Sequence, residues 1–117
     1  MFKIEAIIRP ERISDVSNAL EQIGCGGFNY QNITGQGKQR GIEVVTGRGA
    51  STINRSAVPK TLLTTVVTKD MKEKAIDAII TASRSSDNGE IGDGKIFVTQ
   101  LAQVVRVRTG EENEAAL

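Results

Sequence analysis

The feature that most constrains the fold is a repeated change of hydrophobic period along the chain. Apolar residues recur at every second position in some segments, which is typical of strands, and at every third or fourth position in others, which is typical of helices. The segments with strand-like patterns are residues 2–8, 28–35, 61–68, 96–98 and 104–107. The segments with helical patterns are residues 13–23 and 75–82. The chain therefore passes twice from strand to helix and back.

This order of elements predicts the fold class. A βαββαβ arrangement with an additional C-terminal strand, and with a long loop between the second and third strands, is an α+β, ferredoxin-like domain. Both helices are then expected on one face of an antiparallel sheet. The residues on the other face are mixed rather than charged, so we expect self-association to cover that face. A length of 117 residues fits a single domain over residues 1–117.

Shorter signals refine the boundaries of the elements. Gly24 is expected to end the first helix, and Asp70 with Glu73 resembles a capping box before the second helix. Residues 36–58 show no regular hydrophobic period and are expected to form one long loop. A loop of this length in a small domain is usually functional or disordered. The acidic tail, residues 110–117, is expected to be loosely held.

Composition excludes several classes of function. The 15 basic and 14 acidic residues leave a net charge of +1, so no strong field attracts nucleic acid or an anionic membrane. The chain has no histidine, which removes the commonest general base and metal ligand, and its single cysteine, Cys25, excludes an internal disulfide. Three Phe, one Tyr and no Trp are too few for a sheet that stacks RNA bases. No apolar run approaches the ~20 residues that cross a bilayer, and no signal peptide pattern is present, so we expect a cytoplasmic protein.

A glycine-rich turn directly before a lysine is the strongest candidate for a binding site. The turn at residues 91–95 carries two glycines and ends in Lys95, and Arg106 and Arg108 are expected on one face of a later strand. Glycines let backbone N–H groups approach an anion closely, and the cationic side chains add charge where phosphate oxygens would lie. Taken singly, each segment is explained equally well by a glycine hairpin or a solvated basic strand face. Together they favour a phosphate site.

With these segments in view, the chain resembles the PII signal-transduction family, the trimeric sensors of nitrogen and energy status. The resemblance covers nearly the whole length. Its segments are residues 3–10 (KIEAIIRP), 35–41 (GQGKQRG), 58–60 (VPK), 91–98 (IGDGKIFV) and 106–111 (RVRTGE). The resemblance implies a homotrimer with one nucleotide site in each cleft between neighbouring subunits, where ATP and ADP compete. It also implies a regulator and not an enzyme.

The resemblance further implies which residues bind the nucleotide. Those that would hold the phosphates supply backbone N–H groups or positive charge, and they are Gly92, Asp93, Gly94, Lys95, Arg106 and Arg108, with Gly35, Gly37, Lys38 and Gln39 at the base of the long loop. Those that would hold the base are Ile7 and Val66 and, from a neighbouring chain, Gly27, Phe28 and Asn29.

A second ligand, 2-oxoglutarate, is implied beside the nucleotide. In the family the residue matching Gln39 helps to hold Mg²⁺, which bridges ATP to 2-oxoglutarate, and the residue matching Lys60 pairs with one of its carboxylates. Arg9 and the backbone near Gly41 lie close by. Because both ligands touch the ends of the loop at residues 36–58, their binding is expected to order or release its tip. The tip would then dock on a target protein, such as an ammonium channel, nitrogenase or another metabolic enzyme or transporter.

The chain departs from the family pattern at three places. The long loop has no tyrosine, so the nucleotidylylation of some branches is not expected. Thr64 stands where an acidic residue usually helps to hold the sugar, and Glu90 stands where a basic residue often precedes the turn. Two alternatives stay open: a divergent sensor of another metabolite, such as bicarbonate or a cyclic nucleotide, that regulates a transporter or carbon metabolism, and a slow ATPase that uses Lys60 or Asp93. The retention of Gln39 and Lys60 favours 2-oxoglutarate over the first alternative.

Overall fold

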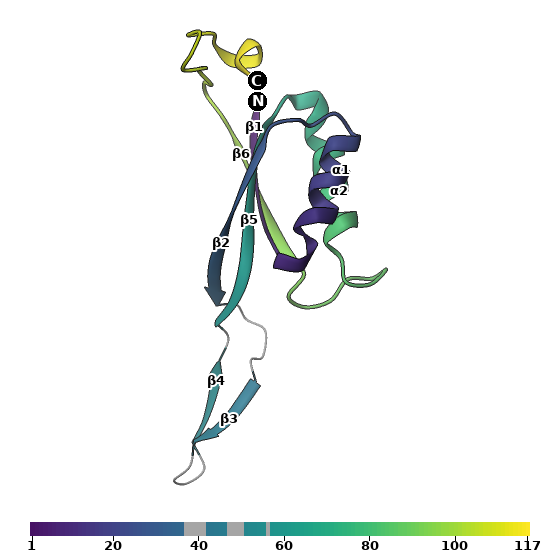
Figure 1. Cartoon of the computed structure of the whole chain (residues 1–117), viewed down its shortest axis with the longest axis vertical. Coiled ribbons are helices and arrows are strands. Elements are labelled where there is room, and N and C mark those ends of the chain that lie inside the picture. Colours follow the sequence, from purple (N-terminus) through teal and green to yellow (C-terminus); the bar gives the residue numbers. More distant parts are fainter. Residues whose placement is uncertain (37–41, 47–50, 56) are drawn as a thin grey trace.

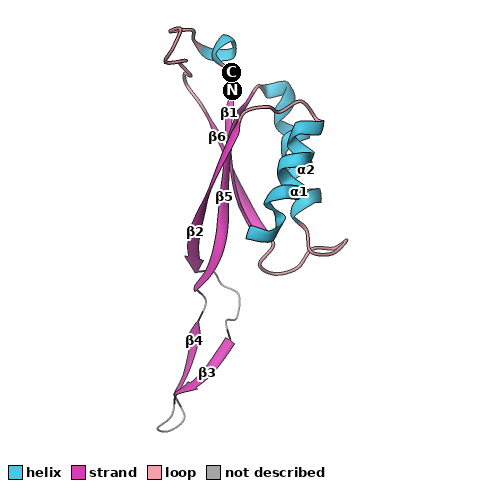
Figure 2. Ribbon diagram, viewed as in Figure 1, coloured by secondary structure: helices cyan, strands magenta, loops and turns pink. Residues whose placement is uncertain are grey.

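The computed structural model describes residues 1–36, 42–46, 51–55 and 57–117. Four strands form one antiparallel sheet, and two helices lie side by side on one of its faces (Figures 1 and 2). The strands of this sheet are β1 (Phe2–Ile8), β2 (Phe28–Gln36), β5 (Ala57–Val67) and β6 (Gly94–Gln100), and the helices are α1 (Ile13–Gln22) and α2 (Lys69–Ser83). The spatial order β2-β5-β1-β6 is that of a ferredoxin-like domain, so the predicted fold class is confirmed.

Strand β1 lies between β5 and β6, and its alternation determines which of its side chains are buried. Ile4, Ala6 and Ile8 lie beneath the helices and are at most 1 % exposed. The side chains that complete this core come from α1, the turn after it, β5 and α2, and they are Val16, Leu20, Cys25, Leu63, Val67, Ala75 and Ile79. Each large aliphatic side chain buried in this way contributes about 1.5–3 kcal/mol, so the cluster is the main source of stability.

The helix boundaries include one confirmed prediction and one wrong prediction. Helix α1 follows a short 3-10 turn, η1 (Pro10–Arg12), and the chain leaves the helix at Gly24, whose φ of 87° suits glycine. Helix α2 begins directly after its N-cap residue, Thr68, so the predicted capping box of Asp70 and Glu73 is wrong. Asp70 instead lies inside the first turn, where its carboxylate stabilises the positive end of the helix dipole.

The segment between β2 and β5 contains two further short strands. Strand β3 (Ile42–Thr46) pairs antiparallel with β4 (Ser51–Arg55). One long loop was expected over residues 36–58, but β2 and β5 reach residues 36 and 57, and the β3–β4 hairpin lies beyond that end of the sheet (Figure 1). The sequence pattern missed the hairpin because β4, with the sequence STINR, has a single apolar residue and no alternation.

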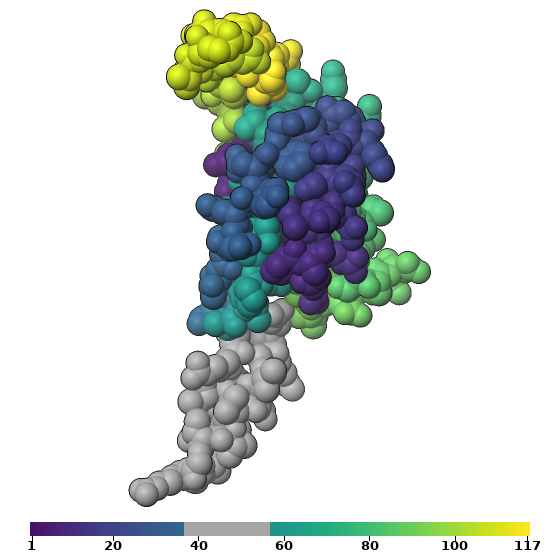
Figure 3. Space-filling model, in the orientation of Figure 1, coloured from purple at the N-terminus to yellow at the C-terminus, as the bar shows by residue number. Residues whose placement is uncertain are grey.

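After β6 the chain turns back on itself instead of adding a strand to the sheet. Residues 104–107 were predicted to form an additional C-terminal strand, and this prediction is wrong, because Val105 forms only an isolated bridge with Glu112. The chain reverses between these two residues, so the segment pairs with its own continuation. The tail, residues 110–117, contains a 3-10 turn, η2 (Asn113–Ala116), and lies at one end of the molecule (yellow in Figure 3). That the tail is loosely held stays a prediction.

Candidate functional site

The glycine-rich turn before β6 packs against the end of β1. Gly92 and Gly94 have φ values of 97° and 129°, in the region that favours glycine. A Cβ atom on Gly94 would lie 1.9 Å from the carbonyl oxygen of Ile7, so any other residue at this position would overlap the backbone of β1. These two glycines therefore determine the path of the turn.

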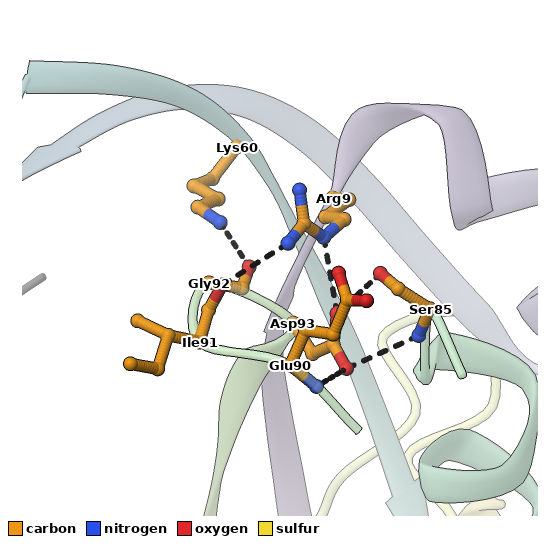
Figure 4. Close-up of polar contacts among 7 residues, drawn as sticks. All are labelled: Arg9, Lys60, Ser85, Glu90, Ile91, Gly92 and Asp93. Atoms are coloured by element: carbon orange, nitrogen blue, oxygen red, sulfur yellow. Dashed lines mark hydrogen bonds and ion pairs between the residues drawn. The ribbon is translucent and has the colours of Figure 1, made fainter. Parts of the chain in front are cut away.

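Asp93 lies at the centre of a polar network that holds this turn (Figure 4). Its Oδ1 accepts hydrogen bonds from Ser85 Oγ (2.5 Å) and Arg9 Nε (3.1 Å), and its Oδ2 accepts them from the backbone N–H groups of Ser85 (3.1 Å) and Glu90 (2.7 Å). Burial by itself raises the pKa of the Asp93 carboxyl, but the bonds from Ser85, Glu90 and Arg9 outweigh burial and hold the pKa far below its ordinary value. The carboxylate is 14 % exposed, charged and already occupied by donors of its own chain.

Two cationic side chains hold the backbone of the same turn. Arg9 Nη2 donates to the carbonyl oxygen of Ile91 (3.1 Å), and Lys60 Nζ donates to the carbonyl oxygen of Gly92 (Figure 4). Burial lowers the pKa of the Lys60 ammonium, and the charge of Arg9 lowers it further, although nearby carboxylates oppose this shift in part. The end of β1, the strand β5 and the turn are thus joined by side chains with positive charge.

The predicted site residues that the structure describes fall into two groups, one at each end of the sheet. The first group surrounds the glycine-rich turn, close to the ends of β1 and β2. It consists of Ile7, Arg9, Gly35, Lys60, Gly92, Asp93, Gly94 and Lys95. Four other predicted residues, Gly37, Lys38, Gln39 and Gly41, lie outside the described residues.

The second group lies where β2 begins and β5 ends. It consists of Gly27, Phe28, Asn29, Val66, Arg106 and Arg108, and Thr64 lies with them, opposite Asn29. The carbonyl oxygen of Gly27 accepts a hydrogen bond from Thr65 Oγ1 (2.6 Å), and a cavity of about 490 Å³ opens beside this bond. This end of the sheet therefore has space for a planar ring system.

The two arginines of the second group do not share a strand face as predicted, because the chain turns where that strand was expected. Arg106 Nη1 donates to a carboxylate oxygen of Glu111 (3.0 Å), and its Nη2 donates to the carbonyl oxygen of Leu117 (3.2 Å). Arg108 is exposed. Both arginines lie in the C-terminal segment, which Figure 3 shows at one end of the molecule, away from the green loop that leads into the glycine-rich turn.

The register of the sheet shows how the two groups are separated along β6. Lys95 lies opposite Ile7, and Gln100 lies opposite Phe2. Five residues of strand span about 17 Å, and Arg106 lies farther along the chain than Gln100. Lys95 and Arg106 of one chain therefore belong to different groups, which lie toward opposite ends of β6.

Ser85 is the functional residue that sequence reasoning missed. It supplies two of the four hydrogen bonds to Asp93, yet it stands in a polar loop whose serines carry no distinguishing pattern. Asp93 was predicted to help cradle phosphates, and this stays a prediction; in the structure its carboxylate accepts the hydrogen bonds that hold the turn. Glu90 was noted for its charge, but its contribution to the network is its backbone N–H group.

A family model described as "Nitrogen regulatory protein P-II" matches residues 1–111. The chain belongs to the P-II family. It is 42 % identical to the nitrogen regulatory protein P-II of Klebsiella oxytoca and 41 % identical to the nitrogen regulatory protein P-II 1 of Escherichia coli (strain K12), in each case over 117 residues and the full length of both chains. It is also similar to the crystal structure of Arabidopsis thaliana PII bound to citrate, with a TM-score of 0.77 and 40 % identity over 99 % of this chain and 91 % of that one.

Membership of the P-II family confirms the resemblance on which the site residues were chosen. The chain is therefore a nitrogen-regulatory signal-transduction protein, and P-II proteins act by interacting with target proteins. In the structure the candidate residues lie in two groups, one at each end of the sheet.

Proposed function

We propose that this protein is a non-enzymatic, cytoplasmic regulator that binds ATP or ADP in clefts between the copies of a homotrimer. With Mg²⁺ and ATP it also binds 2-oxoglutarate, and the segment at residues 36–58 docks on a target of nitrogen metabolism according to which ligands are bound. The observation that carries this proposal is the division of the phosphate-binding candidates between opposite ends of the sheet. Each group is then one half-site, and a complete nucleotide site forms only where the glycine-rich turn of one copy meets Arg106 and Arg108 of the next copy.

The charges of the described residues suit a polyanion at the turn. Lys95 is exposed there, Lys60 and Arg9 lie behind the turn, and the carboxylate of Asp93 is neutralised by its own partners. A related protein from Arabidopsis is described as bound to citrate, which is itself a polyanion. The part of the chain that the structure describes contains no cluster of three metal-binding side chains, so Mg²⁺ would be held mainly by the nucleotide's phosphates together with Gln39.

Replacing a cation in either half-site is expected to weaken nucleotide binding. Lys95→Ala and Arg106→Ala each remove a charged contact to phosphate, worth about 1.5–3 kcal/mol, so we expect Kd for ATP and ADP to rise by about ten- to a hundredfold. Isothermal titration calorimetry measures this change. The matched control is Lys74→Ala, which removes a cation from the exposed face of α2. Equal affinities in all three variants and the parent would reject the site.

Mixing the two weakened variants tests whether the site is shared between copies. If each site takes Lys95 from one copy and Arg106 from the next, random assembly of the two variants recreates an intact site at about one position in four, whatever the number of copies in the ring. We therefore expect co-assembly of Lys95→Ala with Arg106→Ala to restore tight ATP binding at about a quarter of the sites. No restoration would show that the two residues act within one chain or not at all.

The position of Lys60 predicts how 2-oxoglutarate binds. Lys60 Nζ donates one of its three N–H groups to the carbonyl oxygen of Gly92, so two remain for a carboxylate. One such contact is weak by itself, so we expect binding of the dicarboxylate only when Mg-ATP supplies further contacts. We expect calorimetry to detect 2-oxoglutarate binding with Mg-ATP but not with ADP, and Lys60→Gln to weaken it at least tenfold while changing ATP affinity less. Binding of 2-oxoglutarate to nucleotide-free protein would contradict this order.

We expect the segment at residues 36–58 to dock on its target protein in a way that depends on the bound ligands. Among the described residues, no helix has the length and apolar character that a bilayer span needs, so a membrane target would be reached by docking. A pull-down from cell extract with ADP, compared with Mg-ATP and 2-oxoglutarate, identifies partners that depend on the ligand. Partners recovered equally under both conditions would argue against control through the ligand sites.

A further inference from the structure

Another cavity lies on the helix side of the sheet, between α2, β6 and the loop at residues 84–91, and it borders the glycine-rich turn at Asp93, Gly94 and Lys95. Its volume is about 600 Å³, which is within the range of pockets that hold small molecules. Aliphatic side chains form its walls, and they are Ile8, Ile76, Ile79, Ile80, Ile96 and Val98. The loop that bounds its mouth projects from the end of α2 (green in Figures 1 and 3). Such walls suit an aliphatic group.

One buried polar atom beside this cavity has no partner among the described residues. Ser83 lines the cavity and is only 6 % exposed, and its Oγ makes no hydrogen bond with any residue that the structure describes. Buried hydroxyl groups in folded proteins are almost always hydrogen-bonded, so an orphan of this kind calls for an explanation. A ligand that brings a hydrogen-bonding group to the end of α2 would provide the missing partner.

Among the residues that the structure describes, four with charged side chains line the cavity, and they are Arg84, Glu90, Asp93 and Lys95. Asp93 is paired with Arg9. Neither Arg84 nor Glu90 forms an ion pair with another residue in the described part of the chain. The Arg84 side chain runs beside Gly89, since its Cγ and Cδ would lie 3.8 and 3.9 Å from a Cβ at that glycine. A guanidinium group suits a carboxylate, and a carboxylate suits an ammonium group. A zwitterion with an apolar side chain complements Arg84, Glu90 and the aliphatic walls.

We propose that this cavity is a second ligand site, which binds a free aliphatic α-amino acid such as leucine. The carboxylate lies at Arg84, the ammonium group lies at Glu90, one of the two pairs with Ser83 Oγ, and the side chain fills the aliphatic walls. The bounding loop also supplies Ser85 and the backbone of Glu90 to Asp93, so an occupied cavity restrains the glycine-rich turn from behind. This effect on the turn is the part that depends on the proposed nucleotide site; binding of the amino acid does not depend on it.

Calorimetry with three probes tests the proposal on the assembled, nucleotide-free protein. L-leucine is expected to bind saturably with one site per chain. 4-Methylpentanoate lacks the ammonium group and 3-methylbutylamine lacks the carboxylate, so each is expected to bind at least tenfold more weakly. The absence of saturable leucine binding would overturn the proposal, and so would equal affinity for either single-charge probe.

Two variants separate binding in the cavity from a loss of folding. Ser83→Ala is expected to weaken leucine binding about three- to tenfold and to leave the melting temperature unchanged or slightly higher, because its hydroxyl has no partner to lose. Arg84→Gln is expected to weaken leucine binding about tenfold, and Lys74→Gln, on the exposed side of the same helix, is expected to have no effect. Unchanged leucine affinity in both Ser83→Ala and Arg84→Gln would overturn the assignment.

A parallel titration of each sample with ATP distinguishes the two proposals. Leucine binding without ATP binding supports the cavity and rejects the proposed nucleotide site. ATP binding without leucine binding rejects the cavity and leaves the nucleotide site standing. If both bind, saturating leucine is expected to change the Kd for ATP at least twofold, and an unchanged Kd would reject the restraint on the turn.

Discussion

Gly94→Ala is expected to abolish the glycine-rich turn as it stands in this structure. The added Cβ would lie 1.9 Å from the backbone carbonyl oxygen of Ile7, and φ at this position is 129°. The unfavourable φ costs about 1–3 kcal/mol, and displacing a packed neighbour costs about as much again, so the free energy of unfolding should fall by on the order of 3 kcal/mol or more. Because the neighbour is backbone of the central strand, side-chain rotation cannot relieve the overlap.

Chemical denaturation at a fixed protein concentration measures this loss, since the stability of an oligomer depends on concentration. The matched control is Gly26→Ala, because a Cβ there meets nothing within 4 Å and φ is not positive. The control is expected to stay within about 1 kcal/mol of the parent. A Gly94→Ala protein as stable as the control would show that the turn is not pressed against β1 in solution.

Asp93→Asn is expected to loosen the turn without creating a steric overlap. The carboxylate accepts four hydrogen bonds, from Arg9, from Ser85 twice and from Glu90, whereas a carboxamide turns one acceptor into a donor that faces other donors. Loss of the charge and of these bonds should reduce the free energy of unfolding by about 2–4 kcal/mol. Nucleotide affinity should also fall, because the turn would no longer be held in place.

The dependence of this loss on pH is a direct check of its cause. The pKa of Asp93 is lower in the folded chain than its ordinary value of 3.8, so the charge contributes stability above that pH and the contribution is lost as the pH falls toward the folded pKa. The stability difference between the parent and Asp93→Asn should therefore be constant near neutral pH and shrink below about pH 4. A difference that persists unchanged in acid would point to packing and not to charge. Ser85→Ala serves as the partner variant, with a smaller loss in the same direction.

The order of strands and helices could be predicted because burial imposes a period on the sequence. Alternation over β1 and the helical spacing of Val16 and Leu20 reflect one buried face in each element. The segment at residues 104–107 alternates equally well, yet it forms no strand of the sheet, because strand formation requires a neighbour and the chain reverses before reaching one. Local pattern does not report where a partner strand lies.

The candidate site could also be predicted only in part, because local sequence patterns do not report contacts that form on folding. Gly94 and Lys95 could be selected from the sequence because their types alone indicate their roles: glycine allows the backbone to approach a ligand closely, and lysine adds a positive charge. Ser85 could not, because its role depends on a contact with Asp93 that only the folded loop creates. The division of the site between the two ends of the sheet also follows from strand register, which no single segment contains.

Strand β5 runs without interruption from Lys60 beside the turn to Val66 beside the second group, a distance of about 20 Å. In a ring of copies, every such strand would touch one cleft with its first half and the neighbouring cleft with its second. A stiff strand shared in this way would transmit a displacement from one cleft to the next, so the clefts of such a ring would be mechanically linked.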